Sequence, residues 1–261
     1  MTLHALRSRD RDPRHNILGN DVFAINWSDG IALLGRLIRD RHFTKISFLN
    51  AHSANAAFDN AELANAFADF LILPDGIGVD IAAQILHGAP FPANLNGTDF
   101  VPAFLVATQA PLKVALLGAT SDNLEGAART LTALAPQHEF IVVNDGFFSR
   151  EDEPHILAEL KRIRPDMLLV AMGVPRQELW ISRNITAEHC TLPVAVGALF
   201  DFLSGAMPRA PLWVRRLRLE WMFRLLLEPA RLFNRYMVGN PLFLSRVLRQ
   251  KMMLVRTHHG G

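Results

Sequence analysis

The sequence predicts an α/β fold: a Rossmann-like, mainly parallel sheet with helices on both faces, followed by a C-terminal helical basic appendage. Three observations support this prediction. From about residue 20, short β-rich runs alternate with longer stretches of helical period, as in parallel sheets. Half of the 261 residues are hydrophobic, enough for a sizeable core. From residue 206 onward the alternation stops and only helical patterns remain.

The elements of the body follow in order. We expect strands over 22–26, 45–50, 70–76, 113–118, 139–145, 166–173 and 193–197. Helical stretches over about 31–40, 78–87, 123–135 and 155–164 lie between them. Capping or acidic residues come just before several of these helices, as at Ser28-Asp29 and Ser121-Asp122. We therefore expect a doubly wound sheet.

The sequence divides into three parts. Residues 1–19 are expected to form a flexible N-terminal tail, 20–205 the α/β body, and 206–261 a membrane-associating helical appendage. The Pro/Asn/Gly-rich stretch 88–100 has no clear period and divides the body into sub-halves of about 20–100 and 101–205. It is either a hinge or a functional loop.

The charge of the chain is unevenly distributed. Residues 205–261 contain ten arginines and one lysine but only two acids, a net +9, so the whole-chain value of +2 leaves −7 for residues 1–204. Large apolar residues such as Trp221 and Phe233 lie between these arginines, a pattern that suits the cytoplasmic face of a membrane. Nucleic acid is the competing anionic partner, but we expect the membrane surface and no nucleic acid. No apolar run approaches the roughly 20 residues of a membrane span, so the association would be peripheral, and the polar N-terminus indicates a cytoplasmic protein.

Ligands of open α/β sheets bind beyond the carboxyl ends of the strands, so polar residues there are candidates. Asn50 closes one strand, although position alone favours a helix N-cap. Asp75, between Pro74 and Gly76, suits a general base. An ordinary Pro-Asp-Gly turn explains it equally well on local sequence.

Three further strand ends could hold a nucleotide. Gly118 and Thr120 lead into a helix whose free N–H groups could hold phosphate. After the next strand, Asp145 precedes Phe147 and Phe148, on which a base or sugar could stack unless they are core residues. Gly173 and Pro175 lead into a first helical turn that contains Arg176 and Gln177. Neither the dinucleotide glycine fingerprint nor a P-loop is present.

The appendage offers a further anion site. If residues 212–227 form one helix, Arg224 lies on its apolar side, where a guanidinium needs an anion. Glu220 and Glu228 could supply it locally, or a diphosphate could bind there. The histidines have no metal-ligand spacing, so we expect no metal site.

Taken together, these residues resemble the WecG/TagA/CpsF family of bacterial glycosyltransferases. The resemblance spans about residues 20–245, and its segments are LPDGIGVDIAAQILHG, LNGTDF, LLGATSDN, MGVPRQELW and the run from VGALFDFLSGAMPRAP to LEWMFRLLLEPARLFNRY. Any one of them would be weak evidence, but their combination is highly specific. The resemblance implies inverting transfer of a sugar from a UDP-sugar to a polyprenyl-diphosphate-linked sugar at the inner leaflet, with no cofactor and no metal.

The resemblance also implies roles for individual residues. Asp75 matches the general base, and Asn50 and Gln177 match pocket residues; we expect Asp75 and Gln177 to be the catalytic residues. Asp201 falls in the UDP-binding region, while Asn94, Thr98 and Asp99 fall in the acceptor and sugar region. The matching arginines of the appendage, which completes the site, are Arg209, Arg224 and Arg231.

This chain departs from the family pattern at two places. Phe48-Leu49-Asn50 replaces a T-x-N, and the loop before Gly97 lacks an arginine. Both departures lie in the acceptor and sugar region and favour a plain hexose donor such as UDP-glucose, as in the xanthan-type branch, over N-acetylmannosamine or its uronic acid. The alternatives are a nucleotide-sugar epimerase or dehydrogenase, disfavoured by the missing fingerprint, and a non-catalytic scaffold that binds anionic surfaces. The sequence leaves the oligomeric state open.

Overall fold

The computed structural model describes residues 13–211, Val214 and 220–259, apart from the side chains of Arg231 and 257–259. Within this part of the chain, eight strands form one sheet in the order β1-β2-β4-β3-β8-β7-β5-β6. The strands are β1 (Arg14–Ile17), β2 (Asn20–Phe23), β3 (Lys45–Leu49), β4 (Phe70–Pro74), β5 (Lys113–Gly118), β6 (Glu139–Asn144), β7 (Met167–Ala171) and β8 (Leu192–Ala195). Only β1 pairs antiparallel, so the predicted mainly parallel α/β fold is confirmed.

The hairpin at the N-terminal edge differs from the expected flexible tail. β1 pairs with β2 through a turn in which Leu18 and Gly19 have φ of 50° and 86°. Ile17 is fully buried, and the guanidinium of Arg14 lies 4.4 Å from the ring centroid of Phe23. The strand is short and polar, so hydrophobic periodicity does not reveal it. Residues 1–12 lie outside the described part of the chain.

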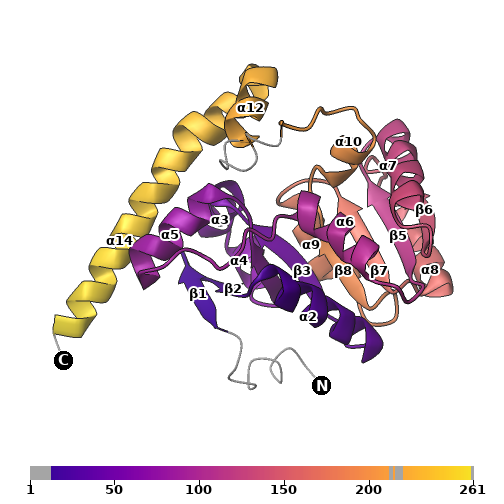
Figure 1. Ribbon diagram of the computed structural model, residues 1–261, viewed down its shortest axis with the longest axis horizontal. Helices are drawn as coiled ribbons and strands as arrows, with labels where there is room; N and C mark the ends of the chain where they lie inside the picture. Colours follow the sequence, from indigo (N-terminus) through magenta and orange to yellow (C-terminus); the bar gives the residue numbers. More distant parts are fainter. Residues whose placement is uncertain (1–12, 212–213, 215–219, 260–261) are drawn as a thin grey trace.

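Helices cover both faces of the sheet, and Figure 1 shows how they surround it. One face packs against α2 (Trp27–Arg39), α6 (Gly97–Ala107), α7 (Ser121–Leu134) and α10 (Leu199–Leu203). The other packs against α3 (Ala51–Asp59), α4 (Ala61–Phe67), α5 (Ile77–His87), α8 (Glu153–Ile163) and α9 (Arg176–Asn184). Alternate strand residues serve the two layers: Leu71 and Leu73 face the first, Phe70 and Ile72 the second. Strands buried on both faces explain why the sequence reads as continuous apolar runs.

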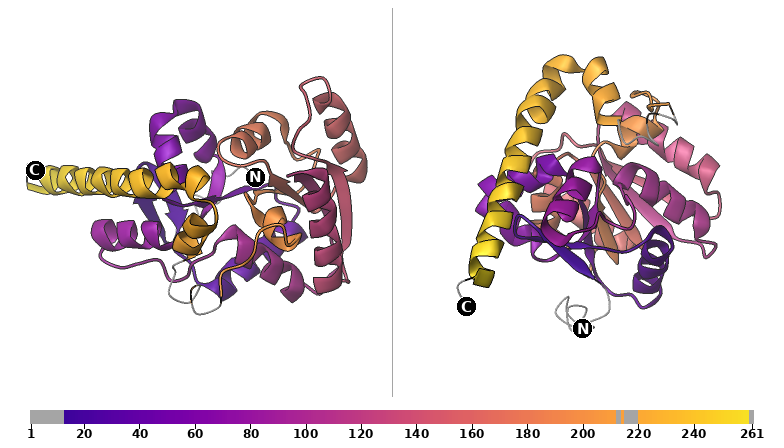
Figure 2. Two further views of the ribbon diagram at one scale, coloured as in Figure 1. Left: turned by 90° about the horizontal axis from the view of Figure 1, so that it is seen from above. Right: turned by 60° about the vertical axis from the view of Figure 1, so that its left-hand side comes forward.

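The appendage contains α12 (Glu220–Leu227), α13 (Pro229–Phe233), the π-helix η1 (Asn234–Val238) and α14 (Gly239–His259). α14 runs along the outside of α3 and α5, and its C-terminal end extends beyond the body (Figures 1 and 2). Phe243 and Val247 are buried in the core that contains α3 and α5. Arg246 forms an ion pair with Asp59 at 2.6 Å. The appendage is therefore packed into the body over the first half of α14. No helix in the described ranges is long and apolar enough to cross a membrane.

Candidate active site

The centre of the candidate site is a contact between two strand ends. β3 and β4 pair in parallel with Leu49 opposite Pro74, so the residues that follow them, Asn50 and Asp75, are neighbours. The Asn50 Nδ2 amide donates a hydrogen bond of 3.0 Å to Asp75 Oδ2. Asn50 Oδ1 meanwhile caps α3 by accepting from the backbone N–H groups of His52 and Ser53. Asn50 is thus the N-cap of α3 and, at the same time, a hydrogen-bond donor to Asp75; its part in the site remains a prediction.

Asp75 is held by the backbone around it. Its N–H donates to the Leu49 carbonyl at 2.9 Å, and the next N–H, of Gly76, donates to Asn94 Oδ1 at 2.8 Å. Gly76 has φ of 89°, a conformation that favours glycine. Asn94 therefore fixes the turn that presents the carboxylate, a role that its sequence context did not indicate.

The electrostatic environment of Asp75 joins the body to the appendage. Burial raises the pKa of Asp75. The Asn50 hydrogen bond and the positive charges of Arg235 and Arg224 oppose this effect on the pKa, while the negative charge of Asp99 adds to it. A carboxyl group with a raised pKa beside cations is a typical general-base candidate.

Arg235 was missed by the sequence analysis. It lies in η1 and also acts on His52, whose pKa is lowered to about 4 by burial and then by the Arg235 charge. Arg231 and Arg235 are four residues apart, a spacing that places them on the same side of a regular helix. The spacing was a usable signal. The side chain of Arg231 lies outside what the structure describes.

Two arginines of the appendage meet at one aromatic ring. The guanidinium carbons of Arg209 and Arg224 lie 4.9 and 5.3 Å from the ring centroid of Phe202 in α10. Arg209 also forms an ion pair with Asp99 in the first turn of α6, and its Nε lies 3.8 Å from Glu220 Oε1. These contacts bring Arg209, Arg224 and Asp99 together. Thr98 next to Asp99 donates its hydroxyl to Asn96 Oδ1 at 2.7 Å.

The loops after β5 and β6 form a second cluster. Gly118 has φ of 120°, and a Cβ there would lie 2.4 Å from the Ala171 carbonyl oxygen, so only glycine fits. Thr120 is the N-cap of α7. Asp145 Oδ2 accepts from the Ser121 hydroxyl at 2.8 Å, and Oδ1 accepts from the Phe147 N–H at 2.9 Å. Two hydrogen bonds lower the pKa of Asp145: the larger effect comes from the Phe147 N–H and the smaller from the Ser121 hydroxyl.

The aromatic pair in the second cluster divides into two roles. Phe147 is 75% exposed and free to stack against a planar ligand group. Phe148 instead packs edge-on against Trp180, with ring centroids 5.8 Å apart, and the Arg176 guanidinium lies 5.3 Å from its centroid. The ring of Phe148 therefore packs against the guanidinium of Arg176.

The loops after β7 and β8 adjoin this cluster. Gly173 and Pro175 come just before α9, and Gln177 in its first turn is 2% exposed, with Oε1 accepting from the N–H groups of Gly173 and Gly197. Asp201 Oδ1 accepts from Asn123 Nδ2 at 2.8 Å. The site residues predicted from the sequence thus form two groups at the carboxyl ends of the strands: the Asp75 group and a strand-end group over β5 to β8. Gln177, which the sequence predicted to be catalytic, accepts hydrogen bonds from backbone N–H groups in this structure.

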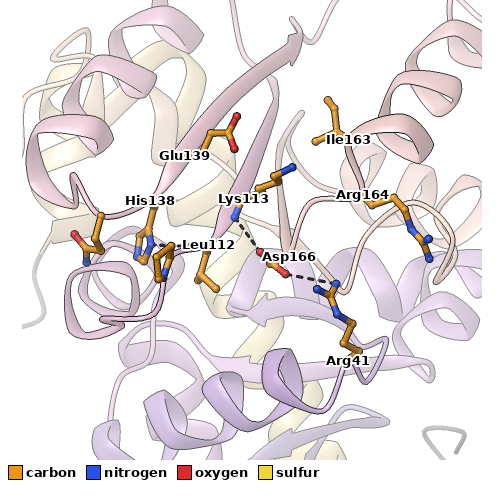
Figure 3. A pocket seen from close by; sticks show the side chains of 10 residues that line it. Arg41, Leu112, Lys113, His138, Glu139, Ile163, Arg164 and Asp166 are labelled. Carbon is orange, nitrogen blue, oxygen red and sulfur yellow. Dashed lines mark hydrogen bonds and ion pairs between the residues drawn. The ribbon is translucent and has the colours of Figure 1, made fainter.

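A pocket of about 920 Å³ lies at the opposite, amino ends of the strands (Figure 3). It is lined by residues at the amino ends of the strands, among them Lys113, Glu139 and Asp166. Asp166 Oδ2 accepts the Lys113 N–H at 2.9 Å, and Arg41 lies 3.7 Å from Oδ1. Because ligands of parallel sheets bind at the carboxyl ends, this pocket is separate from the candidate active site. No group of three potential metal ligands occurs among the described residues.

Comparison with known proteins adds the family. The model of the glycosyl transferase WecG/TagA/CpsF family matches residues 15–257. Similar proteins include N-acetylglucosaminyldiphosphoundecaprenol N-acetyl-beta-D-mannosaminyltransferases from Bacillus spizizenii (32% identical over 195 residues, 74% of each chain), Bacillus subtilis strain 168 (30% over 208 residues, 79% of each) and Staphylococcus aureus strain NCTC 8325 (31% over 181 residues, 69% of each). With a family match over nearly the whole chain and relatives of 30% identity or more, this protein belongs to the WecG/TagA/CpsF family of glycosyltransferases.

Proposed function

We propose that this protein transfers an N-acetylmannosamine-type sugar, with inversion, from a UDP-sugar to a polyprenyl-diphosphate-linked N-acetylglucosamine in cell-surface glycan synthesis. The observation that carries the proposal is the hydrogen-bonded Asn50–Asp75 pair, whose carboxyl group interacts with the positive charges of Arg224 and Arg235. A carboxylate at a strand end, next to cations from a separate helical segment, suits a reaction that deprotonates a hydroxyl and expels a diphosphate.

In the proposed mechanism Asp75 is the general base. The acceptor hydroxyl attacks the anomeric carbon of the donor, its proton passes to Asp75, and the bond from that carbon to the UDP oxygen breaks. Attack on the face opposite the leaving group inverts the configuration. A raised pKa strengthens the base, and general-base catalysis contributes about 10²–10⁴-fold to a rate. Asn50 orients the carboxylate through its 3.0 Å bond.

The arginines would bind the diphosphate groups of the donor and the acceptor. UDP would lie over the strand-end group of β5 to β8, with Phe147 offering a stacking surface and Arg176 a positive charge. Arg224 and Arg235 would neutralise the charge that develops on the leaving diphosphate or that of the lipid diphosphate, because guanidinium groups bind such oxygens bidentately. We therefore propose that transfer needs no divalent cation, and it should persist in EDTA.

The donor proposal follows the relatives and not the sequence departures. The similar proteins are named for transfer of N-acetylmannosaminyl groups to N-acetylglucosaminyldiphosphoundecaprenol. Phe48, one of the departures that favoured glucose, is buried, and a Cβ on Gly97 would lie 2.9 Å from its ring. Its ring fills space in the core beside α6, so packing accounts for this departure without a change of donor.

A donor screen tests the proposal. Purified protein would be offered radiolabelled UDP-N-acetylmannosamine, UDP-N-acetylmannosaminuronic acid and UDP-glucose with a synthetic N-acetylglucosamine-diphosphate lipid, in EDTA. We expect transfer from an N-acetylmannosamine-type donor. Transfer from UDP-glucose alone would restore the hexose interpretation, and binding of anionic surfaces without any transfer would support the scaffold.

The appendage also supports a membrane-surface proposal. In the described part of the appendage the exposed large apolar side chains are Met222, Leu226, Leu227, Phe233, Met237, Val238, Leu242, Leu248, Met252, Met253, Leu254 and Val255. Arg249 and Arg256 of α14 are also exposed. Such a surface fits the anionic cytoplasmic leaflet that contains the lipid acceptor. We expect the protein to float with phosphatidylglycerol vesicles, and serine substitutions at Met252, Met253 and Leu254 to abolish flotation while transfer to a soluble short-chain acceptor continues.

A further inference from the structure

Glu178 is a buried carboxyl group that the proposed mechanism does not use. It lies in the first turn of α9 and is 1% exposed. Its Oε1 accepts hydrogen bonds from Gln177 Nε2 at 2.8 Å and from the Ser47 hydroxyl of β3 at 3.2 Å. Its Oε2 is buried without a hydrogen-bond partner among the residues that the structure describes. Burying a carboxyl group with one oxygen unpaired costs free energy, so its local contacts must offset that cost.

The contact with Gln177 explains what the carboxyl group does. Gln177 Oε1 accepts from the N–H groups of Gly173 at 3.2 Å and Gly197 at 3.1 Å. Both glycines are left-handed, with φ of 76° and 58°, and they follow the neighbouring strands β7 and β8. One amide oxygen therefore ties together two strand-end loops. If the amide turned over, its NH₂ group would face two other donors with no acceptor between them.

Glu178 prevents that rotation because it accepts from Gln177 Nε2 and so fixes which end of the amide faces the loops. The two loops lead to Arg176 and Asp201, which belong to the strand-end group over β5 to β8. We infer that Glu178 is a positioning residue for the UDP-sugar subsite, acting through Gln177 on the Gly173 and Gly197 loops. The donor-binding part of this inference rests on the proposed function.

The protonation state of Glu178 suggests a pair of substitutions that test the positioning role. Burial raises the pKa of Glu178, against the opposing effects of hydrogen bonds from Gln177, from its own backbone N–H and from Ser47. A protonated carboxyl group has one acceptor oxygen and one donor, as the amide of glutamine does. Glu178→Gln should therefore preserve the contacts with Gln177 and Ser47. Glu178→Leu keeps a similar volume but leaves the Gln177 NH₂ group unpaired.

Two measurements on the full-length protein test the inference. Calorimetry gives the Kd for UDP, which we expect to rise about tenfold in Glu178→Leu, because loops released from Gln177 must be ordered again on binding, and to stay near wild type in Glu178→Gln. Amide hydrogen exchange at Gly173 and Gly197 should accelerate in Glu178→Leu and remain slow in Glu178→Gln. Gln177→Leu should reproduce the Glu178→Leu effects, and combining the two should add little, because both break one network.

The outcomes separate this inference from the proposed function. Unchanged exchange at both glycines in folded Glu178→Leu overturns the positioning role, and faster exchange with an unchanged UDP Kd overturns its link to the donor. If wild-type protein fails to bind UDP, the proposed function fails, while the exchange data still decide the positioning role. Should Glu178→Leu not fold, Ser47→Ala removes one of the two bonds to Oε1 and is expected to shift both readouts in the same direction by less.

Discussion

The body and the appendage hold their parts of the site in different ways. In the body, Asn50 and Asp75 follow paired strands and are fixed by short bonds to each other and to neighbouring backbone. In the appendage, Arg209 and Arg224 lie over one ring at 4.9 and 5.3 Å, on long side chains whose position depends on where the helices dock. The comparison indicates that the sheet fixes Asp75, the proposed base, whereas the positions of the arginines depend on how the appendage docks.

The largest effect should come from the body. Asp75→Asn keeps the size of the side chain and removes the base, so we expect kcat to fall by about 10²–10⁴-fold. The Kd for UDP should stay near normal, because the nucleotide is expected over other strand ends. Steady-state transfer and calorimetry measure the two quantities. Near-wild-type turnover would reduce Asp75 to a turn residue and remove the contrast between the two regions.

Changes in the appendage should come next. Arg224→Ala and Arg235→Ala each remove a guanidinium close to Asp75, and losing one charged hydrogen bond of about 1.5–3 kcal/mol corresponds to roughly 10–150-fold in kcat/KM. The assay uses detergent and a short-chain acceptor, so that membrane docking plays no part. Arg249→Ala, an exposed arginine of α14, is the matched control. Equal effects in all three variants would show that general positive charge matters and not position.

A smaller effect concerns stability. The raised pKa of Asp75 means that the fold favours its neutral form. The stability it contributes is complete below the unfolded-state pKa of about 3.9 and is lost as pH rises through the folded-state pKa. Asp75→Asn should therefore raise the Tm by a few degrees at pH 8 and by much less at pH 4. A Tm gain that is the same at both pH values would mean that ionisation of Asp75 is not its cause.

The smallest effect concerns His52, beside the appendage. Its pKa is lowered to about 4 in the fold, against about 6.5 when unfolded. The stability that its neutral form contributes is present above pH 6.5 and is lost as pH falls toward 4. Urea unfolding of His52→Gln should show a weaker loss of stability than wild type over that interval. Parallel pH curves for the two proteins would contradict the lowered pKa.

The sequence predicted more of the body than of the appendage. The seven expected strands are present, and most of them, such as β4, β7 and β8, are buried on both faces and appear as apolar runs, whereas β1 buries only Ile17 fully and gives no such signal. The 88–100 stretch lacks regular structure only up to Asn96, which caps α6. The boundaries of the three parts and of the two sub-halves remain a prediction, although α14 shares the core of the body.

The site divides in the same way. Asp75 could be predicted because ligands of parallel sheets bind at strand carboxyl ends, and the register of β3 and β4 then brings Asn50 to it. The four-residue spacing from Arg231 marked Arg235 as a candidate, but its approach to Asp75 and the backbone contacts of Gln177 could not be predicted. Both depend on how the helices dock and on which loops approach each other. Residues 212–213 and 215–219, over which a continuous helix was considered, lie outside the described part of the chain.

The central claim is that Asp75 accepts the proton from the attacking hydroxyl, and the pH dependence of kcat/KM tests it most directly. For wild-type protein the account predicts a plateau at high pH and a tenfold fall per pH unit once pH drops below the raised pKa of Asp75. The residual activity of Asp75→Asn should lack that acidic limb. The same limb in Asp75→Asn, or a flat wild-type profile, would contradict the claim.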